Sequence, residues 1–178
     1  MDINDVAQQI FARIGCFDIA EWLGNLAQTL GIDSTELMPV PVVESKTVTI
    51  EGKGLKLTVR YRHTNDMVNS DPMYWTLTDA EFNLVGNSEG RWDGALPCGL
   101  DRHASTPESA GALLGDGTYG LKPENIAAGD FRQTFFLNDN RVAGITWKRT
   151  LVGIDHLHLI RLGGNIPFVP ANLQCVCN

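Results

Sequence analysis

Apolar residues in the first thirty positions recur at helical spacing. Between residues 3 and 14 they return every three or four positions, and Gly15 ends the run. A second run of the same kind follows Asp18, which forms a capping-box-like pair with Glu21 three residues later, and it ends at Gly31. Because each run has one broad apolar face, the pattern predicts two amphipathic helices.

Further along the chain, apolar and polar residues alternate, which is typical of strands with one face in water. Such runs predict strands at residues 46–51, 55–61, 74–85, 131–137, 142–149 and 154–162. The third run is long enough to require a bend near Asp79 and Ala80. Residues 116–129 are rich in turn residues and are expected to be irregular. Since crossover helices do not alternate with the strands, we predict an α+β protein with N-terminal helices and an antiparallel sheet.

The stretch from residue 90 to residue 115 separates the two groups of predicted strands. Thr106 followed by Pro107 is typical of a helix start, because threonine can cap the first turn and proline fits the first helical position. We expect this helix to end at Leu114, with Gly115 in the left-handed conformation.

The length of the chain, residues 1–178, suits a single compact domain. Thr29–Pro39 and Leu113–Pro123 share a Leu-Gly pair, a later leucine and a closing proline at equal spacing. If this similarity is an internal repeat, a helix followed by three strands occurs twice, in halves 1–87 and 88–178. Both arrangements fit the sequence.

The charge and cysteine content narrow the classes of function. There are 14 basic and 21 acidic residues, for a net charge of -7, so we expect no direct binding of nucleic acid, which requires clustered Lys and Arg. No apolar run reaches the ~20 residues of a membrane span, and the acidic N-terminus does not resemble a secretory signal. We therefore expect a cytoplasmic protein without a membrane partner. Free thiols are expected at Cys16, Cys98, Cys175 and Cys177.

Two histidines are candidates for binding a metal ion. His156 and His158 are two residues apart on a predicted strand, so they share one face and could hold a metal. A structural role is favoured, because no third ligand is near in the sequence. Asp101, His103 and Ser105 are residue types of a catalytic triad, but no nucleophile motif accompanies them. We expect no enzyme activity, no cofactor and no metal site.

Residues 90–162 resemble a group of small bacterial immunity proteins that are encoded beside polymorphic toxins and secretion-system effectors. The resemblance rests on Gly94-Ala95-Leu96-Pro97, Gly99-Leu100, Thr106-Pro107-Glu108-Ser109, Leu114-Gly115 and Ile154-Asp155-His156-Leu157-His158-Leu159. The chain departs from the pattern at Cys98, where the family has an aromatic residue, and the resemblance ends at Leu162. The family has no catalytic residues.

The resemblance implies an immunity protein that binds one cognate toxin or effector domain and occludes its active site or substrate groove. Acidic residues gather around the third predicted strand and the central stretch, which is either an ordinary solvated face or a patch complementary to a basic partner. If the toxin is a nuclease, its groove is basic. We then predict Asp79, Glu81, Trp92 and Asp93 as partner-binding residues.

Two alternatives remain open at this point. The chain could be a small-ligand-binding or hydrolytic α+β domain that uses His156 and His158, with His103 as a further candidate. It could also be an effector adaptor or chaperone, which would present an exposed apolar groove.

Overall fold

A computed structural model describes the chain except for residues 17–18, 39–44, 63–73, 116–117, 138–140 and 162–178. Its helices are η1 (Ile3–Asp5), α1 (Val6–Arg13), α2 (Ala20–Leu30), α3 (Ser34–Leu37), η2 (Pro97–Gly99), α4 (Pro107–Leu114) and α5 (Pro123–Ala127). Its strands are β1 (Ser45–Ile50), β2 (Leu55–Arg62), β3 (Tyr74–Asn83), β4 (Thr118–Tyr119), β5 (Arg132–Phe136), β6 (Arg141–Trp147) and β7 (Ile154–Arg161). The predicted α+β class is confirmed.

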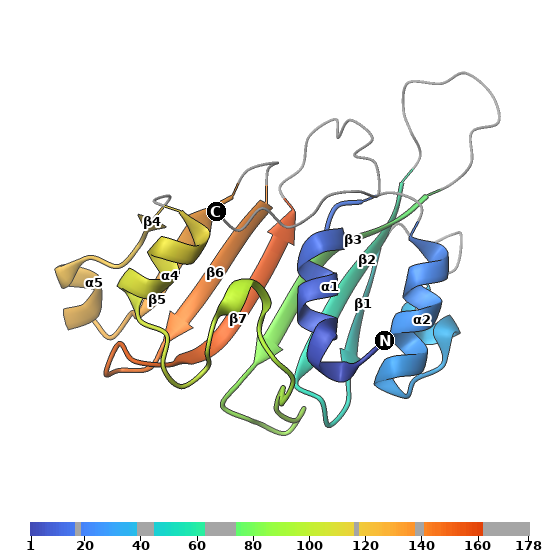
Figure 1. The fold of residues 1–178 in the computed structure, drawn as a ribbon, viewed down its shortest axis with the longest axis horizontal. Helices are drawn as coiled ribbons and strands as arrows, with labels where there is room; N and C mark the ends of the chain where they lie inside the picture. Colours follow the sequence, from blue (N-terminus) through green and yellow to red (C-terminus); the bar gives the residue numbers. More distant parts are fainter. Residues whose placement is uncertain (17–18, 39–44, 63–73, 116–117, 138–140, 162–178) are drawn as a thin grey trace, which may run out of the picture.

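The strands form one seven-stranded sheet in the order β1-β2-β3-β7-β6-β5-β4, and every neighbouring pair is antiparallel. Strands β1 to β3 form one half of the sheet and β4 to β7 form the other, and the two halves meet where β3 pairs with β7 (Figure 1). Each half is built from a helix, a short helix and three successive strands. These are α2, α3 and β1 to β3 in the first half, and α4, α5 and β5 to β7 in the second. The division into two similar halves of sequence stays a prediction.

The main core lies between the sheet and the helices. Helices α1, α2 and α4 lie on the same side of the sheet (Figure 1). Inward-pointing residues of the central strands, such as Leu57, Phe82 and Leu157, are at most 1% exposed. They share one apolar cluster with Ile10 of α1 and Leu23 of α2, as the helical spacing predicts. Burial of this apolar surface is the main stabilising contribution to the fold. None of the described helices combines the length and apolar character needed to cross a membrane.

A β-bulge lies close to the position where the third strand was expected to bend. The pairing of β2 with β3 shifts between Thr58 and Val59, so that Thr78 has no opposite partner. The Thr78 hydroxyl donates to the Thr58 carbonyl at 3.3 Å. The extra residue therefore lies one position before Asp79. A bulge of this kind bends the strand and increases its local twist.

Some local expectations are changed by the structure. Residues 116–129 were expected to be irregular, but they include the short strand β4 and the helix α5. Gly115 has φ 91° and ψ 172°, so it does not take the left-handed helical conformation, which occurs instead at Gly31. The proposed cap Asp18 lies outside the described residues. Thr106 caps α4 as predicted, by accepting a hydrogen bond from Ser109 N–H at 3.2 Å.

The central stretch is anchored to the sheet by two side chains. Trp92 is 1% exposed and packs edge-on against Phe82, with ring centroids 5.3 Å apart. Arg102 donates to the Trp92 and Gly94 carbonyls, at 2.7 Å in both cases. The Arg102 carbonyl accepts from Ile154 N–H at 2.9 Å. Arg102 therefore links the segment after β3 to the first residue of β7.

We expect Arg102→Met to lower the free energy of unfolding by about 2–4 kcal/mol, because two part-buried carbonyls lose a charged donor. Urea denaturation would measure the change. The matched control is Arg91→Met, since Arg91 also pairs with Asp93 but its side chain is 56% exposed. That change should stay within about 0.5 kcal/mol. Equal losses in both variants would contradict the role assigned to Arg102.

Candidate functional site

The face of the sheet opposite the helices is polar at its centre, and we call it the open face. It is formed by the alternate positions of the strands that do not point into the core. Its central members are Lys56, Thr58, Asp79, Glu81, His156, His158 and Ile160. All seven are partly or fully exposed, whereas their inward-pointing neighbours are buried. The open face therefore offers side chains on a backbone held by hydrogen-bonded strands.

Four charged or titratable side chains meet at the middle of the open face. We call Lys56, Asp79, Glu81 and His158 the central cluster. Glu81 lies directly between two cross-strand neighbours, Lys56 on β2 and His158 on β7. Lys56 Nζ is 3.6 Å from Glu81 Oε2, and His158 Nε2 is 2.9 Å from Asp79 Oδ1. The strand pairing thus joins residues from distant parts of the sequence into one group.

The environment of His158 favours its charged form. Burial lowers the pKa of His158, but the hydrogen bond to Asp79 and the negative charges of Asp79 and Glu81 raise it, and the net pKa lies above the ordinary value of 6.5. The side chains remain partly exposed, at 37% for His158 and 26% for Asp79. Solvent screening therefore limits the energy of this pair.

The structure separates the four predicted partner-binding residues. Asp79 and Glu81 lie together on the open face, in the central cluster. Trp92 is buried in the core and is therefore not accessible to a partner in this structure. Asp93 is exposed in the central stretch, where its carboxylate is 2.8 Å from Arg91 Nε and 3.4 Å from an Arg102 guanidinium nitrogen. Lys56, which sequence reasoning did not select, belongs to the cluster.

The predicted histidine pair lies on one face, but its members have different surroundings. His158 belongs to the central cluster, while His156 is exposed on the same face beside Asn83. His103 lies in the loop before α4, and its backbone N–H donates to the Asp101 carboxylate at 2.6 Å. Within the described residues, three metal-ligating side chains come within 4.8 Å of one another at Asp79, Glu81 and His158 alone.

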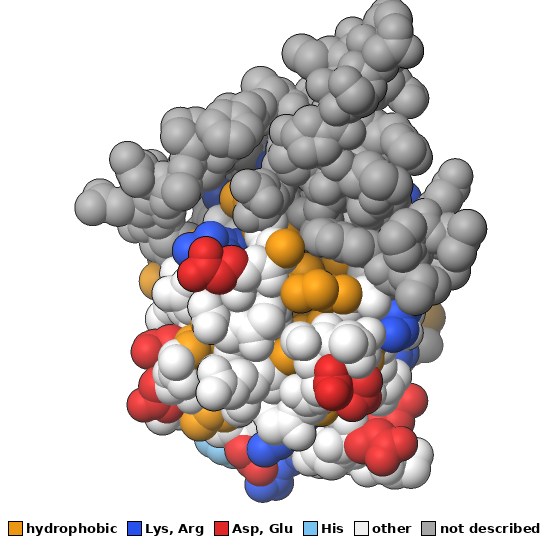
Figure 2. All heavy atoms as spheres, turned by 90° about the vertical axis from the view of Figure 1, so that its right-hand side faces the viewer, with side chains coloured by type: hydrophobic (Ala, Val, Ile, Leu, Met, Phe, Trp, Pro, Cys, Tyr) orange, Lys and Arg blue, Asp and Glu red, His pale blue; other side chains and the backbone are white. Residues whose placement is uncertain are grey.

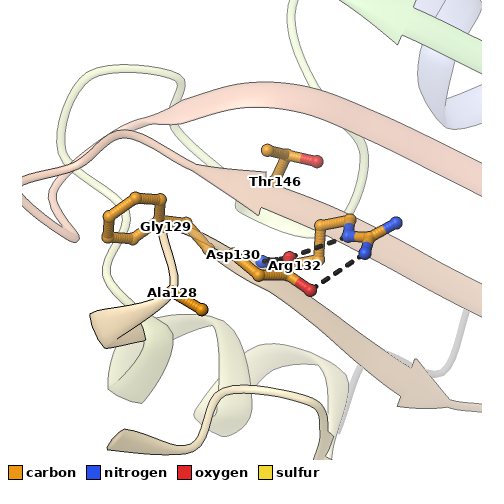
Figure 3. A pocket seen from close by; sticks show the side chains of 6 residues that line it. Ala128, Gly129, Asp130, Arg132 and Thr146 are labelled. Carbon is orange, nitrogen blue, oxygen red and sulfur yellow. Dashed lines mark hydrogen bonds and ion pairs between the residues drawn. The ribbon is translucent and has the colours of Figure 1, made fainter. Parts of the chain in front are cut away.

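A separate hollow lies where α5 leads into β5 (Figure 3). It is lined by Ala128, Gly129, Asp130, Phe131, Arg132 and Thr146. The Arg132 guanidinium donates to both carboxylate oxygens of Asp130, at 2.8 and 2.9 Å. These hydrogen bonds lower the pKa of Asp130 to about 2. The two charged side chains of this hollow therefore neutralise each other.

The flank formed by α2 and β1 has no dominant charge. Figure 2 shows acidic and basic side chains dispersed over this side, with a group of hydrophobic side chains in the middle of the view. Dispersed charges of both signs favour solubility over the recognition of one charged ligand. The charges on this side therefore give no reason to prefer it as the site for a charged ligand.

The chain is an α+β protein with helices on one side of an antiparallel sheet and a charged cluster on the other. Comparison with known proteins finds no match: no family model, no curated protein and no solved structure matches the chain. The function must therefore be argued from the open face itself.

The pairing of His158 with Asp79 predicts a pH-dependent contribution to stability. The pKa of His158 is higher in the folded protein than its ordinary value of 6.5, which applies to the unfolded chain. The contribution to stability is therefore fully present below about pH 6.5 and is lost as the pH rises through the pKa of the folded state. Asp79→Asn should remove most of it, which we expect to be at most about 1 kcal/mol for a partly exposed pair.

Urea unfolding of the wild type and of Asp79→Asn, from about pH 5.5 to about pH 8.5, would test this. The two proteins should differ more at the acidic end than at the basic end. A titration of the imidazole by NMR should show a lower pKa for His158 in the variant. An unchanged pKa would contradict the assigned interaction.

Proposed function

We propose that this chain is a cytoplasmic immunity protein. It binds one cognate toxin or effector domain and covers that domain's active site or substrate groove. It acts by contact, without making or breaking bonds. The observation that carries the proposal is the open face, a preformed sheet surface with a charged cluster at its centre.

The geometry of the open face supports the proposal because a preformed surface lowers the entropy cost of binding. A protein surface that is ordered before contact loses little conformational freedom in the complex, and this favours tight association. The central cluster is held by the pairing of β2, β3 and β7, so its backbone positions are set in the free chain. In protease–inhibitor complexes, where one protein blocks the active site of another, the backbone of the interface likewise moves little on binding.

The charge of the chain supports a basic partner. The whole chain has a net charge of -7, and in the central cluster the carboxylates of Asp79 and Glu81 are paired with His158 and Lys56. An acidic molecule is attracted to a basic groove over the range of the Debye length, which speeds the encounter. A toxin domain that acts on nucleic acid would have such a groove, and the immunity protein would contact that domain and not the nucleic acid.

The two alternatives have less support. A hydrolytic or ligand-binding domain would use converging histidines, but His156 does not join the central cluster of His158. An adaptor would present a continuous apolar groove. The large apolar side chains that are exposed in the described part of the chain come from four separate segments, at Met1, Val85, Phe136 and Val152.

Co-expression would test the proposed function. The protein encoded by the reading frame beside this gene should be toxic alone, and this chain should restore growth and co-purify with it. If the neighbouring protein is toxic and this chain neither rescues growth nor binds it, the proposal is wrong. Turnover of a substrate by the purified chain would also overturn it.

A charge reversal would test the open face as the binding surface. Glu81→Lys should slow association with the toxin domain by about tenfold at low salt, and the difference should shrink as salt is added. Stopped-flow or surface-plasmon measurements would give the association rate. Glu81 suits this test because its side chain is 47% exposed, so the substitution leaves the core intact.

The matched control is Glu108→Lys, which makes the same change at an exposed position of α4, on the helical side of the sheet. This variant should alter the association rate by much less. If both variants slow association equally, the effect comes from net charge alone, and the open face is not the binding surface.

A further inference from the structure

We propose that Asp79, Glu81 and His158 form a binding site for one divalent transition-metal ion of the Zn²⁺ class. The site is a property of the free chain and does not depend on the proposed partner. The metal-ligating candidates expected from the sequence are the pair His156 and His158 and, for a soft metal, the terminal pair Cys175 and Cys177. The sheet supplies the two carboxylates.

The first argument is the arrangement of the ligand atoms. Glu81 and His158 are directly opposite on β3 and β7, and Asp79 lies two residues before Glu81, so all three side chains point to the open face. Their ligand atoms all lie within 4.8 Å of one another. His158 Nε2 and Asp79 Oδ1 are 2.9 Å apart. Two ligands of a tetrahedral zinc ion, each at about 2.0–2.1 Å, are about 3.3 Å apart, so small rotamer changes would open the site.

The second argument is the chemistry of the donor set. One imidazole nitrogen and two carboxylates suit Zn²⁺ and its neighbours Co²⁺, Ni²⁺ and Mn²⁺, whereas a soft ion such as Cu⁺ would require thiolate or thioether ligands. The two carboxylates bring two negative charges, which the ion would neutralise. On binding, His158 releases the Nε2 proton that it shares with Asp79 to solvent, the freed Nε2 lone pair goes to the metal, and the hydrogen bond between Asp79 and His158 is replaced by two metal-ligand bonds.

The third argument is access. All three side chains remain partly exposed, so an ion can enter without unfolding. The position opposite His158 on β6 is Gly144, which adds no side chain on that flank of the imidazole. Three protein ligands on an open surface leave further coordination positions to water, as in zinc sites that exchange ligands.

Lys56 gives the proposal a specific consequence. Its ammonium group lies 3.6 Å from Glu81 Oε2, so it forms an ion pair with the carboxylate that the metal would bind. A cation at this position also repels a second cation. Removal of the Lys56 charge should therefore tighten metal binding by at least about fivefold, which is the effect of one unit charge about 4 Å away at the dielectric of bulk water. A purely structural network would show no such gain.

Calorimetric titration with Zn²⁺ and the visible spectrum with Co²⁺ would test the site, using the full chain with Cys175→Ser and Cys177→Ser so that these thiols cannot compete. We expect one ion per chain. His158→Gln, Asp79→Asn and Glu81→Gln should each weaken binding at least about tenfold, and Lys56→Met should strengthen it. His156→Gln is the matched control, because His156 is exposed on the same strand and face, and it should leave binding unchanged.

The absence of binding by this full chain would overturn the proposal, and so would binding that the three ligand substitutions leave unchanged. If a ligand variant fails to fold, the Co²⁺-loaded chain without ligand substitutions still decides the question. Its paramagnetic NMR shifts should locate the ion between β3 and β7. An ion located elsewhere would refute the site.

Discussion

The antiparallel pairing of β3 with β7 is the interaction on which the rest of the structure depends. These strands are separated by about seventy residues of sequence. Their pairing joins the three strands of one half of the sheet to the four strands of the other half. The register fixes both faces at once, because a shift by one residue would exchange inward and outward side chains. Phe82 opposite Leu157 lies in the core, and Glu81 opposite His158 lies on the open face.

The burial of the two faces is unequal, and this asymmetry gives the molecule its open face. Helices α1, α2 and α4 cover one side of the sheet, where the apolar side chains are removed from water (Figure 1). The central stretch closes one end of this layer by inserting Trp92 against Phe82, and Arg102 holds its backbone. Trp92 and Arg102 thus serve mainly to position the central stretch on the sheet.

Both proposals use the same property of the open face, which is that its side chains are placed by paired strands and not by a loop. A rigid arrangement lowers the entropy cost of binding a protein, and it also lowers the cost of gathering ligands around an ion. The central cluster combines charges of both signs in a partly exposed setting. Binding would replace these internal pairs, which are weak because water screens them.

Several features of the fold could be predicted from the sequence because they depend on neighbours along the chain. The spacing of apolar residues gave α1 and α2, period-two alternation gave six of the strands, and Thr106 was identified as the cap of α4. Features that depend on a specific geometry were missed. They include the bulge at Thr78, the short strand β4 and the conformation of Gly115.

The sequence by itself determined the α+β class, the antiparallel strands and the common face of His156 and His158, since these follow from local periodicity. Only the tertiary structure decided the strand order, the burial of Trp92 and the meeting of Glu81 with His158. The physical reason is that the register between distant strands is set by packing of the whole apolar face. No short stretch of sequence contains that information.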